Sequence, residues 1–228
     1  MYEQDFSRKS SFGGLMQKIY SWMSVALVVT GGVAYYVANT PSLVEMFLKN
    51  SYMFFFLIIV QLGLVLALSA FMEKLNYGTA LVLFLIYSAL MGLTLSTIFM
   101  VYTTTSIEVT FFITAAMFAS MAVYGYFTNT DLSQVGSILI MCLFGIIISS
   151  FVNFLLKSSM LDTITSFVGI VVFAGLTAYD VQKFKALSHM NISAQESGKL
   201  SLLGALTLYL DFINLFLMLL RFTGKQRD

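Results

Sequence analysis

Long apolar segments separated by short polar connections run through the whole chain. Seven of these segments are predicted to be helical spans, at about 17–38, 51–72, 79–101, 108–127, 134–156, 163–187 and 202–222. Each has roughly 20 or more residues, which is enough for a helix to cross about 30 Å of hydrocarbon. A segment such as SYMFFFLIIVQLGLVLALSAF also lacks the strict alternation of a membrane β-barrel strand. The pattern therefore predicts an all-α membrane protein, a bundle of seven transmembrane helices.

The polar segments leave no room for a separate soluble domain. Residues 1–14 are predicted to form a flexible polar tail, residues 15–222 a single seven-helix membrane domain, and residues 223–228 a short basic tail. The first span has an apolar core longer than the 7–15 residues usual in a signal peptide, so we expect it to be retained. Any function must then reside in the membrane bundle.

Composition supports the membrane location and excludes several functions. Hydrophobic residues make up 59% of the chain and charged residues 10%, against about 25% charged residues in soluble domains. The net charge of +1 argues against a nucleic-acid partner, which would require a basic surface. The chain has one cysteine, Cys142, and one histidine, His189. We therefore expect neither a Cys/His metal site nor histidine-assisted nucleophilic catalysis. We therefore expect no enzyme and no cofactor, with the lipid bilayer and ions as partners.

The distribution of lysine and arginine predicts the orientation in the membrane. With the N-terminus inside, the inner side carries Arg8, Lys9, Lys18, Lys74, Lys183, Lys185 and Lys199. The outer connections carry Lys49 and Lys157, and the C-terminal end adds Arg221, Lys225 and Arg227. This favours a cytoplasmic N-terminus and an external C-terminus, although the basic tail argues the other way.

Two aspartates, Asp180 and Asp211, lie well inside predicted spans. A charge at a helix centre costs about 2.5–3.5 kcal/mol on insertion, and no lysine or arginine lies deep enough in a span to neutralise them. Asp180 lies about seven residues before the end of its span and Asp211 about nine after the start of the next, roughly 10–14 Å from the same membrane face. Because consecutive antiparallel helices commonly pack together, the two carboxylates are expected to face each other.

Such a pair has a specific chemistry. Two carboxylates held close in a low dielectric cannot both ionise easily, so they are expected to share a proton and titrate as a unit. The pair can sense protons, or it can bind a cation that replaces the proton, and Ca²⁺ prefers oxygen ligands of this kind. A purely structural interpretation stays open, in which Asp180 and Asp211 form an interhelical hydrogen bond or reach a watery vestibule.

Four other polar side chains are candidates for a pathway or for support of the pair. Thr207 and Asn214 are spaced to share the helical face of Asp211, whereas Tyr209 is not. Gln61 is polar and lies in the middle of its span, where it could line a pathway or join two helices.

Several stretches together resemble the Bax inhibitor family (transmembrane Bax inhibitor motif proteins), in the form of a bacterial member. They are YSALMGLTLSTIFMVYT at 87–103, YGYFTNTDLSQVG at 124–136, GLTAYDVQ at 175–182 and GALTLYLDFINLFLMLLRF at 204–222. The resemblance implies a seven-helix bundle with the last helix central, in the bacterial inner membrane, and a pH-sensitive Ca²⁺ leak. It also implies a di-aspartyl pH sensor, which falls here on Asp180 and Asp211.

The chain departs from the family at one point. In a bacterial relative an arginine on the second helix latches the aspartate pair, whereas the second span here ends ALSAFMEKLN, with Lys74 as the nearest cation. The resemblance therefore does not fix what holds the pair closed.

Two other functions remain open at this stage. A proton-coupled cation exchanger would use the same carboxylates, and sequence does not separate it from a leak. An intramembrane aspartyl protease would also need two aspartates on adjacent helices. However, Asp211 lies in YLDF rather than in the Gly-x-Gly-Asp motif of presenilin-like proteases. Their Pro-Ala-Leu motif is also absent, because the only proline is Pro41.

Overall fold

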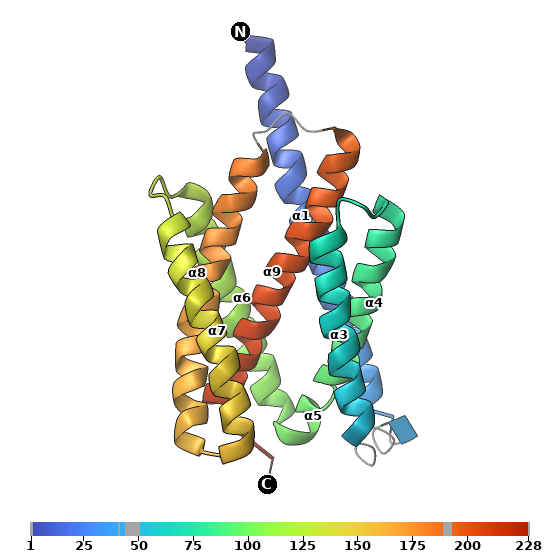
Figure 1. Cartoon of the computed structure of the whole chain (residues 1–228), viewed down its shortest axis with the longest axis vertical. Helices are drawn as coiled ribbons and strands as arrows, with labels where there is room; N and C mark the ends of the chain where they lie inside the picture. The colour runs from blue at the N-terminus through green and yellow to red at the C-terminus, as the bar shows by residue number, and fades with distance from the viewer. Residues whose placement is uncertain (1, 41, 44–50, 189–192, 228) are drawn as a thin grey trace. The chain divides into compact units, whose positions relative to one another are not determined.

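The computed structural model describes residues 2–40, 42–43, 51–188 and 193–227 (Figure 1). His189, Pro41 and Lys49 lie outside these residues. The helices of the described part are α1 (Tyr2–Ala38), α3 (Ser51–Phe71), α4 (Tyr77–Leu95), α5 (Ile98–Val101), α6 (Thr104–Phe127), α7 (Ser133–Leu156), α8 (Ser159–Ser188) and α9 (Ala194–Thr223). The described chain is thus all-helical, and its only β contact is an isolated bridge between Tyr102 and Gln226.

Six of these helices are long and apolar enough to cross a membrane. They cover Gly14–Ala38, Tyr77–Val101, Thr104–Phe127, Ser133–Leu156, Ser159–Ser188 and Gln195–Thr223. The predicted span at 51–72 coincides with α3. Within α3, the apolar stretch found among the described residues is shorter, Phe55–Phe71. The six long spans confirm the expectation of a multi-helix membrane protein.

Two boundaries differ from the predictions. α1 begins at Tyr2, so the backbone of the expected polar tail is helical. α9 begins at Ala194 rather than near residue 202, because Ser193 and Glu196 form a reciprocal cap. The Glu196 carboxylate accepts a hydrogen bond from the Ser193 amide at 2.9 Å, and the Ser193 hydroxyl accepts one from the Glu196 amide at 3.2 Å. This capping box starts the helix in polar sequence that hydropathy alone reads as a connection.

The described chain divides into two compact units. The first contains Met1–Val101 and Ser188–Tyr209, and the second contains Tyr102–Leu187 and Leu210–Asp228. α9 contributes its first part to one unit and its second part to the other. That residues 15–222 form a single domain therefore stays a prediction.

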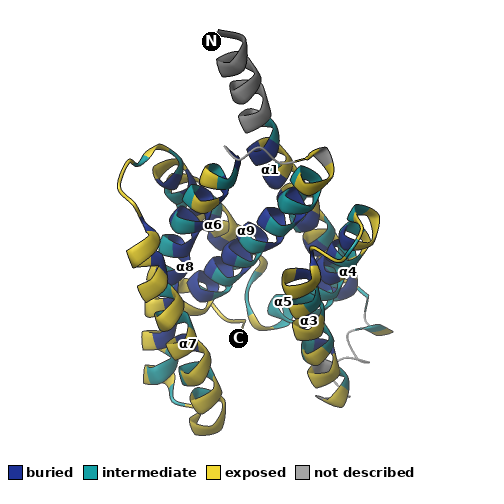
Figure 2. Cartoon of the chain, turned by 45° about the horizontal axis from the view of Figure 1, so that its top comes forward, coloured by how far each residue is buried: buried dark blue, intermediate teal, exposed yellow. Residues whose placement is uncertain are grey.

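Burial differs sharply among the candidate spans. Of the apolar window of α9, 72% is buried inside the protein, against 6% of the window of α7. Figure 2 shows this contrast as a largely dark-blue α9 and a largely yellow α7. Helix α7 therefore presents most of its surface outward, where a membrane protein meets lipid.

Candidate functional site: an aspartate pair on α8 and α9

Asp180 on α8 and Asp211 on α9 lie against each other within the second unit. Both are buried, with 8% and 5% of their surface exposed, and their side chains are within hydrogen-bonding reach of one another. Two ionised carboxylates have no hydrogen to donate, so this contact is a hydrogen bond only when one of them carries a proton. The pair is thus favourable in a singly protonated state and repulsive when both groups ionise.

The surroundings of the pair are asymmetric. Lys183 follows Asp180 by three residues on α8, so the two lie on one face of the helix. No donor among the described residues reaches Oδ2 of Asp211.

Helix α8 is held tightly against α6 and α7 just before Asp180. A Cβ at Gly125 of α6 would overlap the carbonyl of Ala178, and one at Gly136 of α7 would lie 2.5 Å from the ring of Tyr179. Only glycine permits such a close approach of helices. The segment GLTAYDVQ is therefore fixed by backbone and ring contacts on the side of α6 and α7.

Two side chains after Asp180 attach α8 to the connection between α6 and α7. Gln182 accepts a hydrogen bond from the Leu132 amide and donates one to the Thr130 carbonyl, both at 2.8 Å. Lys185 donates to the Tyr126 carbonyl at 2.5 Å, and its ammonium lies 5.1 Å from the centre of the Tyr126 ring. Together with the glycine contacts at Ala178 and Tyr179, these bonds hold α8 in position before and after Asp180.

Tyr209, two residues before Asp211, is a structural anchor of the first unit. Its hydroxyl forms a 2.7 Å hydrogen bond with Thr30 of α1, and its ring packs edge-on against Phe84 and Tyr87 of α4. Thr30 in turn donates to the Ser88 carbonyl at 2.8 Å. Because Tyr209 is completely buried, it fixes α9 against α1 and α4 immediately before the aspartate.

The two polar side chains predicted to share the face of Asp211 bond to their own helix. The Thr207 hydroxyl donates to the Leu203 carbonyl at 3.0 Å, and the Asn214 amide donates to the Leu210 carbonyl at 2.8 Å. Each bond reaches back one turn along α9, which is a common way to satisfy a polar side chain in an apolar helix.

Gln61 joins two helices of the first unit. Its amide nitrogen donates to the Leu90 carbonyl at 2.8 Å and to the Thr94 hydroxyl at 2.7 Å, both on α4. Of the two interpretations left open by the sequence, these bonds support the structural one. Lys74, the nearest cation by sequence, lies over the ring of Phe71, 5.6 Å from its centre.

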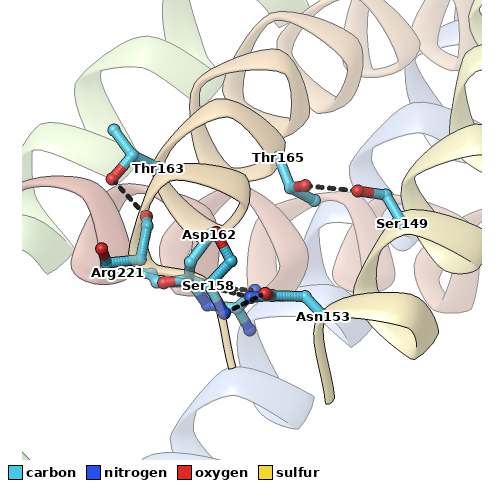
Figure 3. A network of polar contacts seen from close by, with 8 residues as sticks. Ser149, Asn153, Ser158, Asp162, Thr163, Thr165 and Arg221 are labelled. Carbon is cyan, nitrogen blue, oxygen red and sulfur yellow. Dashed lines mark hydrogen bonds and ion pairs between the residues drawn. The ribbon is translucent and has the colours of Figure 1, made fainter. Parts of the chain in front are cut away.

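A second polar cluster in this unit lies where α7 ends and α8 begins (Figure 3). Arg221 of α9 pairs with Asp162 of α8 at 3.5 Å, and the Asn153 amide lies 3.5 Å from the same carboxylate. Nearby, the hydroxyls of Ser149 and Thr165 are 2.6 Å apart and link α7 to α8. Arg221 is therefore held by a carboxylate of α8.

The aspartate pair does not form a complete metal cage. The described residues contain no group of three or more His, Cys, Asp or Glu side chains that could hold a metal ion. Ca²⁺ takes six to eight oxygen ligands, so a Ca²⁺ ion at Asp180 and Asp211 would keep part of its water shell.

The two aspartates meet although the two helix ends lie at unequal distances from them, and their equal depth below a membrane face stays a prediction. With α8 ending at Ser188 and α9 beginning at Ala194, Asp180 lies about 12 Å from its helix end and Asp211 about 25 Å from its helix start. Because α9 continues into the polar connection, the two helix ends do not mark a common plane.

Comparisons with known proteins show which family and which relatives this chain is similar to. Residues 13–228 match the family described as inhibitor of apoptosis-promoting Bax1. The chain is 51% identical to inner membrane protein YbhL of Escherichia coli (strain K12) over 214 residues, which cover 93% of this chain and 92% of the relative. An uncharacterized protein of Borreliella burgdorferi is 45% identical, covering 99% and 97%. One from Rickettsia prowazekii is 44% identical, covering 93% and 90%.

Proposed function

Because the chain belongs to the Bax inhibitor family and is a multi-pass membrane protein, we propose that it is a pH-sensitive Ca²⁺ leak of the bacterial inner membrane. The gate is the pair Asp180 and Asp211, and the protein has no catalytic activity. The inner-membrane location follows the name of its Escherichia coli relative.

One observation carries the proposal: two buried carboxyl groups lie in contact on adjacent spans, where one proton decides between attraction and repulsion. With the proton present, the hydrogen bond holds α8 to α9. When the proton leaves, the two negative charges repel and attract a cation instead. Ionisable groups at such depth commonly mark ion or proton pathways.

The proposal includes the topology. α3 serves as the remaining span, so that seven helices cross the membrane with the N-terminus in the cytoplasm, and α9 is the central helix. The high burial of α9 supports its central position. Gln61, which bonds to α4, supports the packing of α3 as a span.

The test is Ca²⁺ flux into proteoliposomes, compared in acidic and alkaline buffer. Asn at either position keeps a hydrogen-bond donor without a titrating proton. Asp180→Asn and Asp211→Asn should therefore abolish most of the difference between the two buffers. Asp131→Asn is the matched control, because that carboxylate is exposed outside the spans, and it should retain the wild-type difference. Unchanged pH dependence in both buried variants would refute the gate.

Two further results would replace the proposal with another function. Accumulation of Ca²⁺ against its own gradient, driven by an imposed pH gradient, would identify a proton-coupled exchanger. Cleavage of a transmembrane peptide that is lost in Asp180→Asn and Asp211→Asn would identify a protease.

A further inference from the structure

Within the second unit α8 and α9 contact each other along a line that we name the α8–α9 seam. Its contacts are Asp180 with Asp211, Gly169 with Met218, and Asp162 with Arg221. At the middle contact, a Cβ on Gly169 would lie 2.8 Å from the Met218 side chain. The seam thus has polar groups at both ends and an apolar side chain between them.

Ser166 lies on this seam. It follows Asp162 by four residues and precedes Gly169 by three, so it shares their helical face. Ser166 is completely buried, and its hydroxyl oxygen has no hydrogen-bond partner among the described residues.

This hydroxyl differs from its neighbours on α8. Thr177 donates to the Phe173 carbonyl at 2.8 Å, and Thr165 bonds to Ser149 at 2.6 Å. A serine in a helix can bond back to the carbonyl four residues earlier, and Ser166 does not. A buried polar group without a partner is costly, and the other such side-chain atom in the described chain, Oδ2 of Asp211, belongs to the same seam.

We propose that the α8–α9 seam is the route by which Ca²⁺ reaches the aspartate pair from the membrane face where α8 begins. In this route Ser166 supplies a hydroxyl ligand and Met218 an apolar barrier. The inference rests on the proposed leak function and assigns its path.

The chemistry of the seam fits a hard divalent cation. Asp162 and Arg221 pair at the entrance with side chains that are 40% and 37% exposed, and an ion pair in contact with water opens at little cost. Opening frees the Asp162 carboxylate for the arriving ion. The Ser166 hydroxyl follows, and the carboxylates of Asp180 and Asp211 complete a series of oxygen ligands. Met218 is unbranched and flexible, so it can move aside for an ion.

The path can be tested by cysteine accessibility, because Cys142 is the only cysteine of the chain. In a Cys142→Ala background, Ser166→Cys is compared with Phe167→Cys, whose native side chain is 55% exposed on the apolar surface. A thiol must ionise in water to react, so a water-soluble cationic thiol reagent should modify Ser166→Cys in membranes at least about tenfold faster than Phe167→Cys. Added Ca²⁺ should slow this reaction. If both thiols react equally slowly, the proposed path along the seam is wrong.

Flux measurements provide a second test that does not depend on the introduced thiol. Ser166→Ala should reduce Ca²⁺ flux severalfold while its remaining pH dependence persists, and Met218→Ala should increase flux in the buffer that closes the wild type. Wild-type values for both variants would reject the path even if the aspartate gate holds. Conversely, a reactive Ser166→Cys in a protein without Ca²⁺ flux would support the hydrated seam and reject the leak function.

Discussion

Helices α7 and α9 are both strongly apolar, yet they occupy opposite environments. The window of α7 has a mean hydropathy of 2.5 and is 6% buried, whereas that of α9 has 1.9 and is 72% buried. The less apolar helix is therefore the buried one, the reverse of the rule in soluble proteins.

The reversal follows from the solvent. Lipid accepts any apolar side chain, so α7 can expose residues such as Phe144, Ile148 and Phe151 without requiring a protein partner. Polar side chains are costly in lipid, so a helix that contains Tyr209 and Asp211 must be surrounded by protein. In this chain polar residues within a span, rather than hydrophobicity, indicate which helix is buried.

The strongest test of this contrast is an aromatic deletion on each helix. Tyr209→Ala removes a buried ring and its hydrogen bond to Thr30, and it should destabilise the protein by roughly 3–5 kcal/mol. Phe144→Ala, at a position that is 63% exposed on α7, should change stability by no more than about 0.5 kcal/mol. Denaturation midpoints in detergent would measure both. Similar losses of stability in the two variants would contradict the difference in burial between α7 and α9.

A smaller effect separates two faces of α7 itself. A Cβ at Gly136 would meet the ring of Tyr179 at 2.5 Å, whereas one at Gly145 meets nothing within 4 Å. Gly136→Ala should therefore destabilise the protein by about 1–3 kcal/mol. Gly145→Ala should be neutral or stabilising by up to about 1 kcal/mol, since alanine favours the helix. The same denaturation assay applies, and a stabilising Gly136→Ala would show that the α7–α8 contact is loose.

The smallest effect concerns the start of α7. Hydrogen bonds from the Ser133 hydroxyl and amide hold the pKa of the Asp131 carboxyl below its usual range. A depressed carboxyl pKa stabilises the fold above the ordinary value of about 3.9, and this stability is lost as the pH falls through the lower folded value. Wild type should thus lose more stability in acid than Asp131→Asn does, in thermal denaturation measured across pH. Parallel pH curves for the two proteins would contradict this role.

Sequence reasoning identified the membrane class and most helices because hydropathy and length determine them. It placed Asp180 opposite Asp211 through chain adjacency, but it missed that Ser193 and Glu196 start α9 early, in polar sequence. It did not find the roles of Gln182 and Lys185, since their partners are backbone groups of another connection. Contacts of this kind have no local signature in a sequence.

The packing of Gly125 against Ala178 has a mechanical consequence. Backbone in direct contact with backbone cannot slide without a collision, and Gln182 fastens the same helix one half-turn beyond Asp180. Asp180 is therefore held in a fixed position relative to α6 and α7. If the two carboxyl groups separate, Asp211 is the one that moves, and the part of α9 that follows the Tyr209 anchor must bend or turn.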